Sequence, residues 1–346
     1  MSDKNSSLES WAVVGVKDDT GSGRASRDLT RLLFPVRHLV TRSYRLEGLV
    51  IGEKDVFLAD DADAEQIERA LKGIEVLIVI EDQPIHHRII RAAENRGIKV
   101  HLVALWEWFS SHHPIGKLYD KIICPNRLCE SIMRKFGFRN TVRLNWPIDV
   151  ANLPERLVAG PAKIFVHNAG KFEVEDRKST LLTLDAFRRV KNPNVSLIVR
   201  SQNPLPYRVE DHRIQYLVGN LPDYRDLYRE GDVLIQASKA EGLGLSILEG
   251  IACGLPVLTT NYPPMNEYIR DSRALVPTHW GKKAAEQSVY ISQAHLKIPR
   301  VDHLARRIEW CAKNDMTSLS HRNRKWALQN FDPDRLRTQW IQALGS

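Results

Sequence analysis

Residues 233–257, VLIQASKAEGLGLSILEGIACGLPV, combine the signals of a strand, a glycine-bearing loop, a helix and the start of a second strand. The apolar run Val233–Gln236 is typical of a buried strand, and the apolar positions of Leu245–Cys253 predict a helix. Gly242 and Gly244 lie between the two, where the absence of a side chain lets a loop approach a ligand closely. Strand, loop, helix and strand in this order predict part of a parallel sheet covered by helices.

The same stretch predicts an anion site beside two carboxylates. The backbone N–H groups that open the helix after Gly244 carry the positive end of the helix dipole, which favours a phosphate. Because a carboxylate repels phosphate, we expect the two glutamates of this stretch to bind hydroxyl groups of a sugar or a ribose. The alternative is a plain strand–turn–helix whose acids face solvent. The predicted ligand loop comprises Glu241, Gly242, Leu243, Gly244, Leu245 and Glu249.

Alternating strand and helix signals continue along most of the chain. They predict an α/β protein with two Rossmann-like, doubly wound domains that face each other across a cleft. The segment Trp146-Pro-Ile-Asp149 interrupts the alternation. We therefore expect an N-terminal domain over residues 1–150 and a C-terminal domain over residues 151–320, with the helices of residues 321–346 packing back toward the N-terminal domain. Residues 277–299 lack clear periodicity and are expected to form an insertion.

The charge of the chain is basic and unevenly distributed. Fifty Lys and Arg against 42 Asp and Glu give a net charge of +8, of which +1 falls in residues 1–150 and +7 in the remainder. Residues 20–45 carry +5, and residues 47–82 carry −8. A basic chain favours acidic partners such as nucleotides, anionic lipids or nucleic acid, although many such charges simply solvate a surface.

Several classes of protein are disfavoured by the sequence. No apolar run approaches the roughly 20 residues of a membrane span, and the polar N-terminus lacks the apolar core of a signal peptide. The four cysteines have neither disulfide nor zinc-ligand spacing, which favours reduced thiols in a cytoplasm. Asp61-Ala-Asp63 and Asp332-Pro-Asp334 precede predicted helices and are expected to cap them. We therefore expect a cytoplasmic protein with no transmembrane segment and no metal site.

Residues 233–267 resemble the donor-binding segment of the group-1 retaining glycosyltransferases, which have two Rossmann domains in the GT-B fold. A second resemblance covers Gly170-Lys171 and Lys178. The family usually has Gly-Arg there with a Lys five residues later, whereas this chain has Lys171 and a spacing of seven. The spacing from Lys178 to the following helix fits the family, which favours Lys178 over Lys171 and makes Arg177 a candidate substitute for the weaker member.

The resemblance implies a nucleotide-diphosphate sugar, linked to UDP or GDP, as the donor substrate, with no further cofactor. It implies catalytic roles for Glu241, Lys178 and Lys171, with the two lysines replacing a metal ion at the departing diphosphate. It extends donor binding from Glu249 and the ligand loop to Glu267, in a loop beyond the next strand. In this family, retention of anomeric configuration is explained by attack on the face from which the phosphate departs.

The predicted N-terminal domain carries a glycine-bearing loop of its own. Gly21 and Gly23 follow the first predicted strand and precede Arg24. In GT-B enzymes this loop approaches the donor phosphate or the acceptor, and Arg24 is a candidate contact. Ser26 stands where the third glycine of a dinucleotide fingerprint would be, which disfavours an NAD enzyme.

Further acceptor-side candidates come from the same domain. Glu107 and His112 follow a predicted strand, whose carboxyl end is where ligands bind in open α/β sheets. Arg24, Arg27 and Arg31 recur at helical spacing, which predicts a basic face for an anionic acceptor. For each of these residues, exposed surface is the plain alternative.

Together these residues predict a retaining glycosyltransferase that moves a sugar from a nucleotide-diphosphate sugar to a hydroxyl acceptor. The basic charge favours an anionic acceptor: a lipid-linked glycan, a membrane surface reached peripherally, or modified DNA. Two alternatives stay open, namely a nucleotide-sugar epimerase on the same fold and a non-enzymatic protein that binds nucleic acid or an anionic surface. An epimerase would act without an acceptor, so its products would separate it from a transferase.

Overall fold

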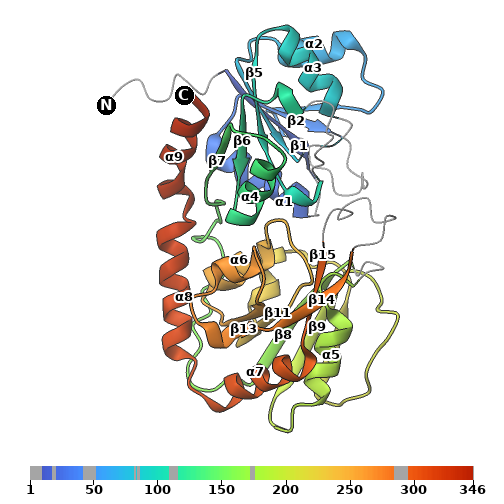
Figure 1. Cartoon of the computed structure of the whole chain (residues 1–346), viewed down its shortest axis with the longest axis vertical. Helices are drawn as coiled ribbons and strands as arrows, with labels where there is room; N and C mark the ends of the chain where they lie inside the picture. The colour runs from blue at the N-terminus through green and yellow to red at the C-terminus, as the bar shows by residue number, and fades with distance from the viewer. Residues whose placement is uncertain are drawn as a thin grey trace. The chain divides into compact units, whose positions relative to one another are not determined.

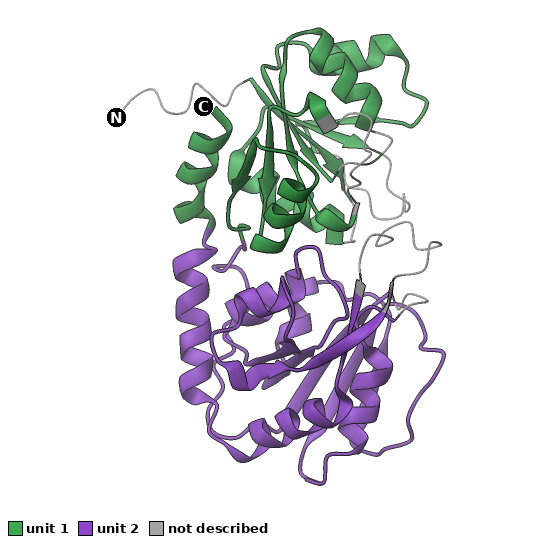
Figure 2. Ribbon diagram, viewed as in Figure 1, with its two compact units in different colours: residues 1–147, 333–346 green, residues 148–332 purple. Residues whose placement is uncertain are grey.

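The computed structural model describes residues 10–17, 21–41, 52–81, 83, 86–108, 116–171, 176–283 and 295–345 (Figure 1). The chain forms two compact units, the first comprising residues 1–147 and 333–346 and the second residues 148–332 (Figure 2). Each unit is built on a parallel sheet with helices, so the predicted fold of two Rossmann-like domains is confirmed. The segment that rejoins the first unit starts at residue 333 and not at 321, because the helix Thr317–Asn330 belongs to the second unit.

The first unit contains a seven-stranded parallel sheet with the order β3-β2-β1-β4-β5-β6-β7. Every residue of β1 and β4 is buried, as is typical of strands in a sheet that is covered on both faces. The strands are β1 (Trp11–Val16), β2 (Arg37–Thr41), β3 (Asp55–Leu58), β4 (Val76–Ile80), β5 (Lys99–Val103), β6 (Lys121–Cys124) and β7 (Thr141–Arg143). The helices are α1 (Gly21–Leu33), α2 (Ala64–Leu71), α3 (His87–Asn95), α4 (Arg127–Lys135) and α9 (Pro333–Gly345), with short 3-10 turns η3 (Trp106–Trp108) and η4 (Gly116–Leu118).

Helix α1 includes the two glycines that were expected in a loop. It begins at Gly21, so Gly21 and Gly23 lie in its first turn and not in a loop before Arg24. Leu29, Leu32 and Leu33 are all buried and form the apolar face of this helix. At α2 the predicted cap is also confirmed: the Asp63 carboxylate accepts a hydrogen bond from the Gln66 backbone, at 2.8 Å.

Helix α9 is attached to the first unit by a tryptophan pair and by its last carbonyl groups. The rings of Trp340 and Trp146 meet edge to face, with centroids 6.2 Å apart. The Lys121 ammonium donates to the Ala343 carbonyl at 2.6 Å, and the buried His101 ring bonds the Leu344 carbonyl at 2.9 Å. These contacts satisfy carbonyls that have no partner within a helix end. The positive charge of Lys121 also interacts favourably with the negative end of the α9 dipole.

We expect Trp340→Ala to lower the free energy of unfolding of the first unit by about 3–5 kcal/mol, because Trp340 is fully buried against Trp146. Trp280→Ala is the matched control and should cost less than about 1 kcal/mol, since Trp280 is 71% exposed. Urea unfolding of both variants measures the two costs. Equal costs would contradict the anchoring role of Trp340.

The second unit contains a six-stranded parallel sheet with the order β10-β9-β8-β11-β12-β13. Its strands are β8 (Ile164–Gly170), β9 (Ser196–Ser201), β10 (Ile214–Val218), β11 (Val233–Gln236), β12 (Val257–Thr260) and β13 (Leu275–Val276). Its helices are α5 (Thr180–Arg188), α6 (Leu245–Cys253), α7 (Val301–Lys313) and α8 (Thr317–Asn330), with 3-10 turns η5 (Tyr224–Tyr228), η6 (Met265–Tyr268) and η7 (Ser272–Ala274).

The segment expected to be an irregular insertion is an antiparallel pair of strands in its described part. Strands β14 (Thr278–Lys283) and β15 (His295–Pro299) pair with a shift of register between Trp280 and Lys283. Such an irregularity breaks the two-residue alternation, which explains why the sequence shows no strand periodicity there. The Lys297 backbone N–H donates to the Lys239 carbonyl at 2.9 Å and so joins β15 to the loop that follows β11.

The strand order of each sheet changes direction next to its first strand. In the second unit β8 has β9 on one side and β11 on the other, and in the first unit β1 lies between β2 and β4. Such a switch point, outside the carboxyl ends of the two strands, is where open α/β sheets bind ligands. In the second unit, the loops that follow β8 and β11 are therefore the expected position of a ligand site.

Candidate functional site

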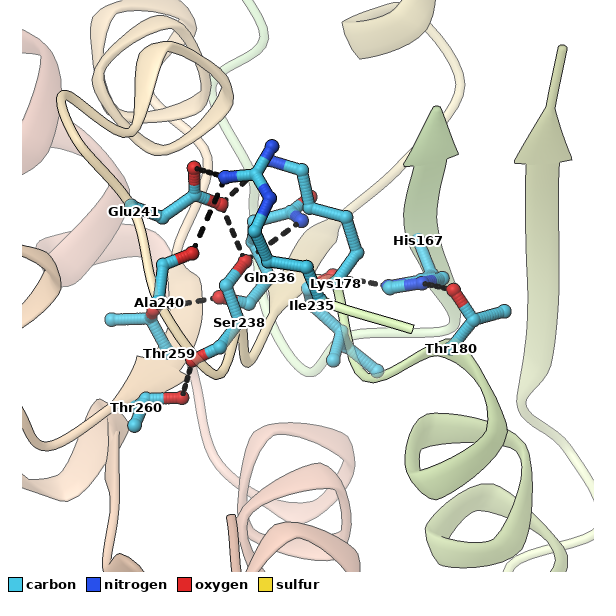
Figure 3. Close-up of polar contacts among 11 residues, drawn as sticks. His167, Lys178, Thr180, Ile235, Gln236, Ser238, Ala240, Glu241, Thr259 and Thr260 are labelled. Atoms are coloured by element: carbon cyan, nitrogen blue, oxygen red, sulfur yellow. Dashed lines mark hydrogen bonds and ion pairs between the residues drawn. The ribbon is translucent and has the colours of Figure 1, made fainter. Parts of the chain in front are cut away.

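Glu241 follows β11 and makes an ion cluster with two cations from the loop after β8 (Figure 3). Its Oε1 accepts hydrogen bonds from the Lys178 ammonium at 2.5 Å and from the Ser238 hydroxyl at 2.6 Å. Its Oε2 accepts one from the Arg177 guanidinium at 2.9 Å. The structure thus brings together Glu241 and Lys178, which the sequence singled out, and it shows that the second cation is Arg177.

A tight turn before α5 presents these two cations. The Asp176 carboxylate accepts hydrogen bonds from the backbone N–H groups of Thr180 and Leu181, at 2.7 and 3.0 Å, and so caps the helix. Asp176 and Ser179 flank the cations in left-handed backbone conformations, with φ of 44° and 58°. Such conformations are uncommon for residues other than glycine. They turn the chain sharply, so that both Arg177 and Lys178 reach Glu241.

A neutral histidine fixes this turn to the sheet. The His167 Nδ1 bonds the Ile235 carbonyl at 2.9 Å, and its Nε2 bonds the Thr180 hydroxyl at the same distance (Figure 3). Because a carbonyl can only accept, Nδ1 carries the proton and Nε2 accepts from the hydroxyl. Burial lowers the pKa of His167, which keeps the ring neutral. His167 is therefore a structural link between β8, β11 and α5.

The loop between β11 and Glu241 is supported by hydroxyl groups of the neighbouring strand β12. The Thr260 hydroxyl donates to the Ser238 carbonyl at 2.6 Å, and the Thr259 hydroxyl donates to the Gln236 carbonyl at 2.7 Å. The Arg177 carbonyl accepts from the Lys239 N–H at 2.8 Å, which joins the two loops through their backbones as well. Ser238 then orients Glu241 directly. The carboxylate thus has a fixed position before any ligand binds.

The cluster keeps Glu241 ionised. Burial alone would raise the pKa of Glu241, but the charges of Lys178 and Arg177 and the hydrogen bonds outweigh it and lower the pKa to about 2. Glu241 is 5% exposed, whereas the side chains of Lys178 and Arg177 each keep 21%. The two cations are therefore the members of the cluster most accessible to a ligand, and a negatively charged ligand suits them.

Helix α6 begins beside this cluster. Gly244 is the N-cap residue of α6 and has a φ of 78°, in the left-handed region that favours glycine. The buried Gly242 and Leu243 lead into it from Glu241, and half-buried Leu245 opens the helix. The positive end of the α6 dipole thus lies one short loop away from Glu241, as the sequence predicts for an anion site.

Glu249, the second predicted glutamate, lies in the middle of α6 and is 3% exposed. Its Oε2 accepts a hydrogen bond from the hydroxyl of Tyr228, which is fully buried at the end of η5. Tyr228 was not singled out from the sequence. No spacing rule links it to Glu249, because the two residues meet only through the packing of η5 against α6.

Two other residues, Lys171 and Glu267, were predicted to bind the donor. Lys171 directly follows β8, and its backbone carbonyl accepts a hydrogen bond from the Asn203 amide at 2.8 Å. Lys171 thus contributes its backbone to the loop after β8, and the Glu241 carboxylate pairs with Arg177 and Lys178. Glu267 is half-buried in η6, which follows β12, at the same edge of the sheet.

The switch point of the first unit carries a carboxylate that the sequence analysis missed. Glu81 follows β4, is 2% exposed, and has a left-handed φ of 57°. Both of its oxygens accept from the Ser22 hydroxyl at 2.9 Å, in the first turn of α1. The Glu81 carboxylate therefore lies beside the first turn of α1, which contains Gly21 and Gly23.

The arginine face of α1 surrounds a carboxylate. The Asp28 Oδ2 accepts from the Trp146 indole at 3.1 Å. Burial raises the pKa of Asp28 to about 6, although that hydrogen bond and the charges of Arg24, Arg31 and Arg27 act in the opposite direction. Arg24, the predicted contact, is half-buried in the first turns of the helix.

The remaining first-unit candidates are Glu107 and His112. Glu107 lies in η3, shortly after the carboxyl end of β5, and is half-buried. His112 lies outside the described residues.

Over the described parts of the chain, no group of three or more His, Cys, Asp or Glu side chains could hold a metal ion. Within the same ranges, no helix has the length and apolar character needed to cross a bilayer. Cys124, Cys129, Cys253 and Cys311 are buried free thiols, as their spacing predicts.

We expect Glu241→Gln to lower the free energy of unfolding by about 3 kcal/mol at pH 7, since the pKa of Glu241 drops from 4.5 to about 2 on folding. A lowered folded pKa gives stability that is fully present above pH 4.5 and is lost as the pH falls toward 2. Urea unfolding at pH 7, 5 and 3.5 should therefore show the deficit shrinking at the lowest pH. Glu65→Gln is the control, because Glu65 is 79% exposed. A deficit independent of pH would contradict the ion cluster.

Residues 164–291 match the family model described as glycosyl transferases group 1. Over this range the chain is similar to the group-1 glycosyltransferases. The matched range begins at β8 and includes the whole ion cluster, α6 and Glu267. The resemblance found in the sequence is thereby confirmed at the level of the family.

A curated relative is the GDP-mannose-dependent alpha-(1-6)-phosphatidylinositol dimannoside mannosyltransferase of Mycobacterium tuberculosis. It is 25% identical over 167 residues, which cover 44% of this chain and 43% of the relative. The match therefore spans less than half of the length of that protein.

Several solved structures share the fold of the whole chain. Anabaena HepE, crystallised with UDP and glucose, has a TM-score of 0.71 at 12% identity, covering 97% of this chain and 99% of HepE. A glycosyltransferase from Rickettsia africae ESF-5 gives 0.68 at 14% identity, covering 96% and 97%. The lipopolysaccharide outer core galactosyltransferase WaaB gives 0.61 at 12% identity, covering 96% and 98%.

Proposed function

We propose that this protein is a retaining, metal-independent glycosyltransferase whose second unit binds a nucleotide-diphosphate sugar linked to UDP or GDP. The observation that carries the proposal is the ion cluster of Lys178, Arg177 and Glu241 at the switch point of a group-1 domain. The HepE crystals with UDP and the GDP-mannose-dependent relative support a nucleoside diphosphate as the leaving group.

Each member of the cluster has a role in this reaction. Lys178 and Arg177 stabilise the negative charge that grows on the diphosphate as its bond to the sugar C1 breaks, and the α6 dipole adds to them. Glu241 accepts a hydrogen bond from a hydroxyl of the transferred sugar. Lys171 and Glu267 contribute at the same edge of the sheet. With two cations at the diphosphate, the reaction needs no metal ion.

Retention of configuration follows from where the acceptor attacks. The acceptor oxygen forms its bond to C1 on the face that the diphosphate leaves, and a phosphate oxygen takes the acceptor's proton. Glu241 is poorly suited to be the base, because a carboxylate with a pKa of about 2 binds protons weakly. NMR of the product would show an unchanged anomeric configuration relative to the donor.

We expect the protein to release nucleoside diphosphate from one member of a panel of UDP- and GDP-sugars in the presence of EDTA. Lys178→Ala should lower kcat by about 100- to 1,000-fold, the usual cost of removing a preorganised group that stabilises charge in the transition state. Lys191→Ala, at an exposed lysine after α5, is the control and should leave kcat unchanged.

Three outcomes of that assay would contradict the proposal. If no sugar nucleotide is consumed, the protein is not a glycosyltransferase of this kind. If Lys178→Ala equals the parent, the cluster is not the diphosphate site. If EDTA abolishes activity and Mn²⁺ restores it, the reaction depends on a metal ion. An epimerised donor formed without any acceptor would instead identify an epimerase.

We propose that the acceptor is an anionic, hydroxyl-bearing molecule of the lipid-linked class, reached by peripheral contact with a membrane. The net charge of +8 and the name of the mycobacterial relative, which refers to a phosphatidylinositol dimannoside, support this class. The arginine face of α1 provides a group of cations on the first unit. DNA as the acceptor is an alternative outcome of the same assay.

Replacing Arg24 and Arg27 by Glu should raise the apparent KM for such an acceptor several-fold and reduce the effect of salt on it, while the KM for the donor stays unchanged. The control reverses Arg88 and Arg91, which are exposed on α3 and change the net charge equally. Kinetics at two salt concentrations, with anionic vesicles carrying a glycolipid and with duplex DNA, measure the effect. Identical results for the two double variants would reduce the α1 face to ordinary surface.

A further inference from the structure

The buried hydrogen bond between Tyr228 and Glu249 connects two elements of the second unit. Tyr228 ends η5, and Glu249 lies in the middle of α6. The Tyr228 hydroxyl donates to Oε2 of Glu249. Tyr228 is fully buried and Glu249 is 3% exposed, so solvent does not compete for this contact.

A carboxylate in this position requires such a partner. Its neighbours along α6 include the buried Ile247, Leu248 and Ile251. An ionised group among apolar side chains is tolerated only when it is hydrogen-bonded. The ring of Tyr228 is fully buried, and close packing around it holds its hydroxyl in one position. The Tyr228 hydroxyl therefore fixes Oε2 and, with it, the direction in which the other oxygen of Glu249 points.

The chemistry of Glu249 selects its ligand. Glu249 lies four residues past Leu245, about 6 Å along the helix axis from the anion site at the start of α6. A carboxylate repels phosphate but accepts hydrogen bonds from hydroxyl groups. In a nucleoside diphosphate, the hydroxyl-bearing group next to the phosphates is the ribose. The positive start of α6 thus suits the phosphates of the nucleotide, and the Glu249 carboxylate further along the helix suits the hydroxyl groups of its ribose.

We infer that Tyr228 is a positioning residue that holds Glu249 in the orientation needed to bind the ribose hydroxyls of the donor nucleotide. This inference rests on the proposed function, since it presupposes a nucleotide in the second unit. Tyr228 acts through Glu249 and does not itself contact the substrate. It makes recognition of ribose depend on a residue in η5, outside the loops that bear the ion cluster.

The experiment compares the affinities for UDP and GDP with those for their 2′,3′-dideoxy forms, measured by calorimetry. The proteins are the parent, Tyr228→Phe, Glu249→Gln and the double variant. The control is Tyr216→Phe, which removes a hydroxyl that bonds the Val209 backbone, at 2.8 and 3.2 Å, at the edge strand β10. The parent should prefer the ribose form, and Tyr228→Phe should reduce this preference about ten-fold.

A purely structural Tyr228 gives a different pattern from a positioning one. Positioning predicts that Tyr228→Phe weakens ribose nucleotides and leaves dideoxy nucleotides unchanged, with kcat at saturating donor within two-fold of the parent. It also predicts that the double variant equals Glu249→Gln, because Tyr228 works through Glu249. The double variant contains no buried charge at this pair and can be measured even if Tyr228→Phe alone does not fold.

Two results would overturn the inference while leaving the proposed function intact. In one, Tyr228→Phe weakens ribose and dideoxy nucleotides equally. In the other, the losses of the two single variants add in the double variant. A parent protein that binds neither UDP nor GDP would instead overturn the proposed function, and this inference with it.

Discussion

The ion cluster of Glu241 with Lys178 and Arg177 is the interaction on which the candidate site depends. It joins the loops that follow β8 and β11, which belong to neighbouring strands and are also connected by the Lys239–Arg177 backbone bond. A buried carboxylate is tolerated there only because both cations and Ser238 satisfy it. In return, the carboxylate holds two long cationic side chains in place, so that little side-chain entropy remains to be lost when an anion binds.

The two glutamates of the ligand loop have different surroundings and therefore different roles. Glu241 is paired with cations, whereas Glu249 is paired with the neutral Tyr228 hydroxyl. The start of α6 thus combines positive charge with backbone donors, and the middle of the same helix presents a negative group. This arrangement fits a ligand with phosphates at one end and hydroxyl groups next to them, which is the chemistry of a sugar nucleotide.

Local patterns in the sequence predicted much of the fold. Most contacts between residues that are distant in the sequence could not be predicted from such patterns. Strands such as Val233–Gln236 and helices such as Leu245–Cys253 were predicted because apolar runs and glycine signals are local. The motif and the family resemblance also singled out Glu241 and Lys178, with Arg177 as a candidate substitute for Lys171. The pair of Tyr228 with Glu249 and the buried Glu81 were missed, because each depends on how separate elements pack. The β14–β15 pair was missed because a shift of register hides its alternation.

A crystal structure of the protein with UDP or GDP tests the central claim most directly. The account predicts that oxygens of the β-phosphate lie within hydrogen-bonding distance of the Lys178 ammonium and the Arg177 guanidinium, next to the first N–H groups of α6. A nucleotide whose phosphates bind elsewhere, with the Glu241 cluster untouched, would contradict it.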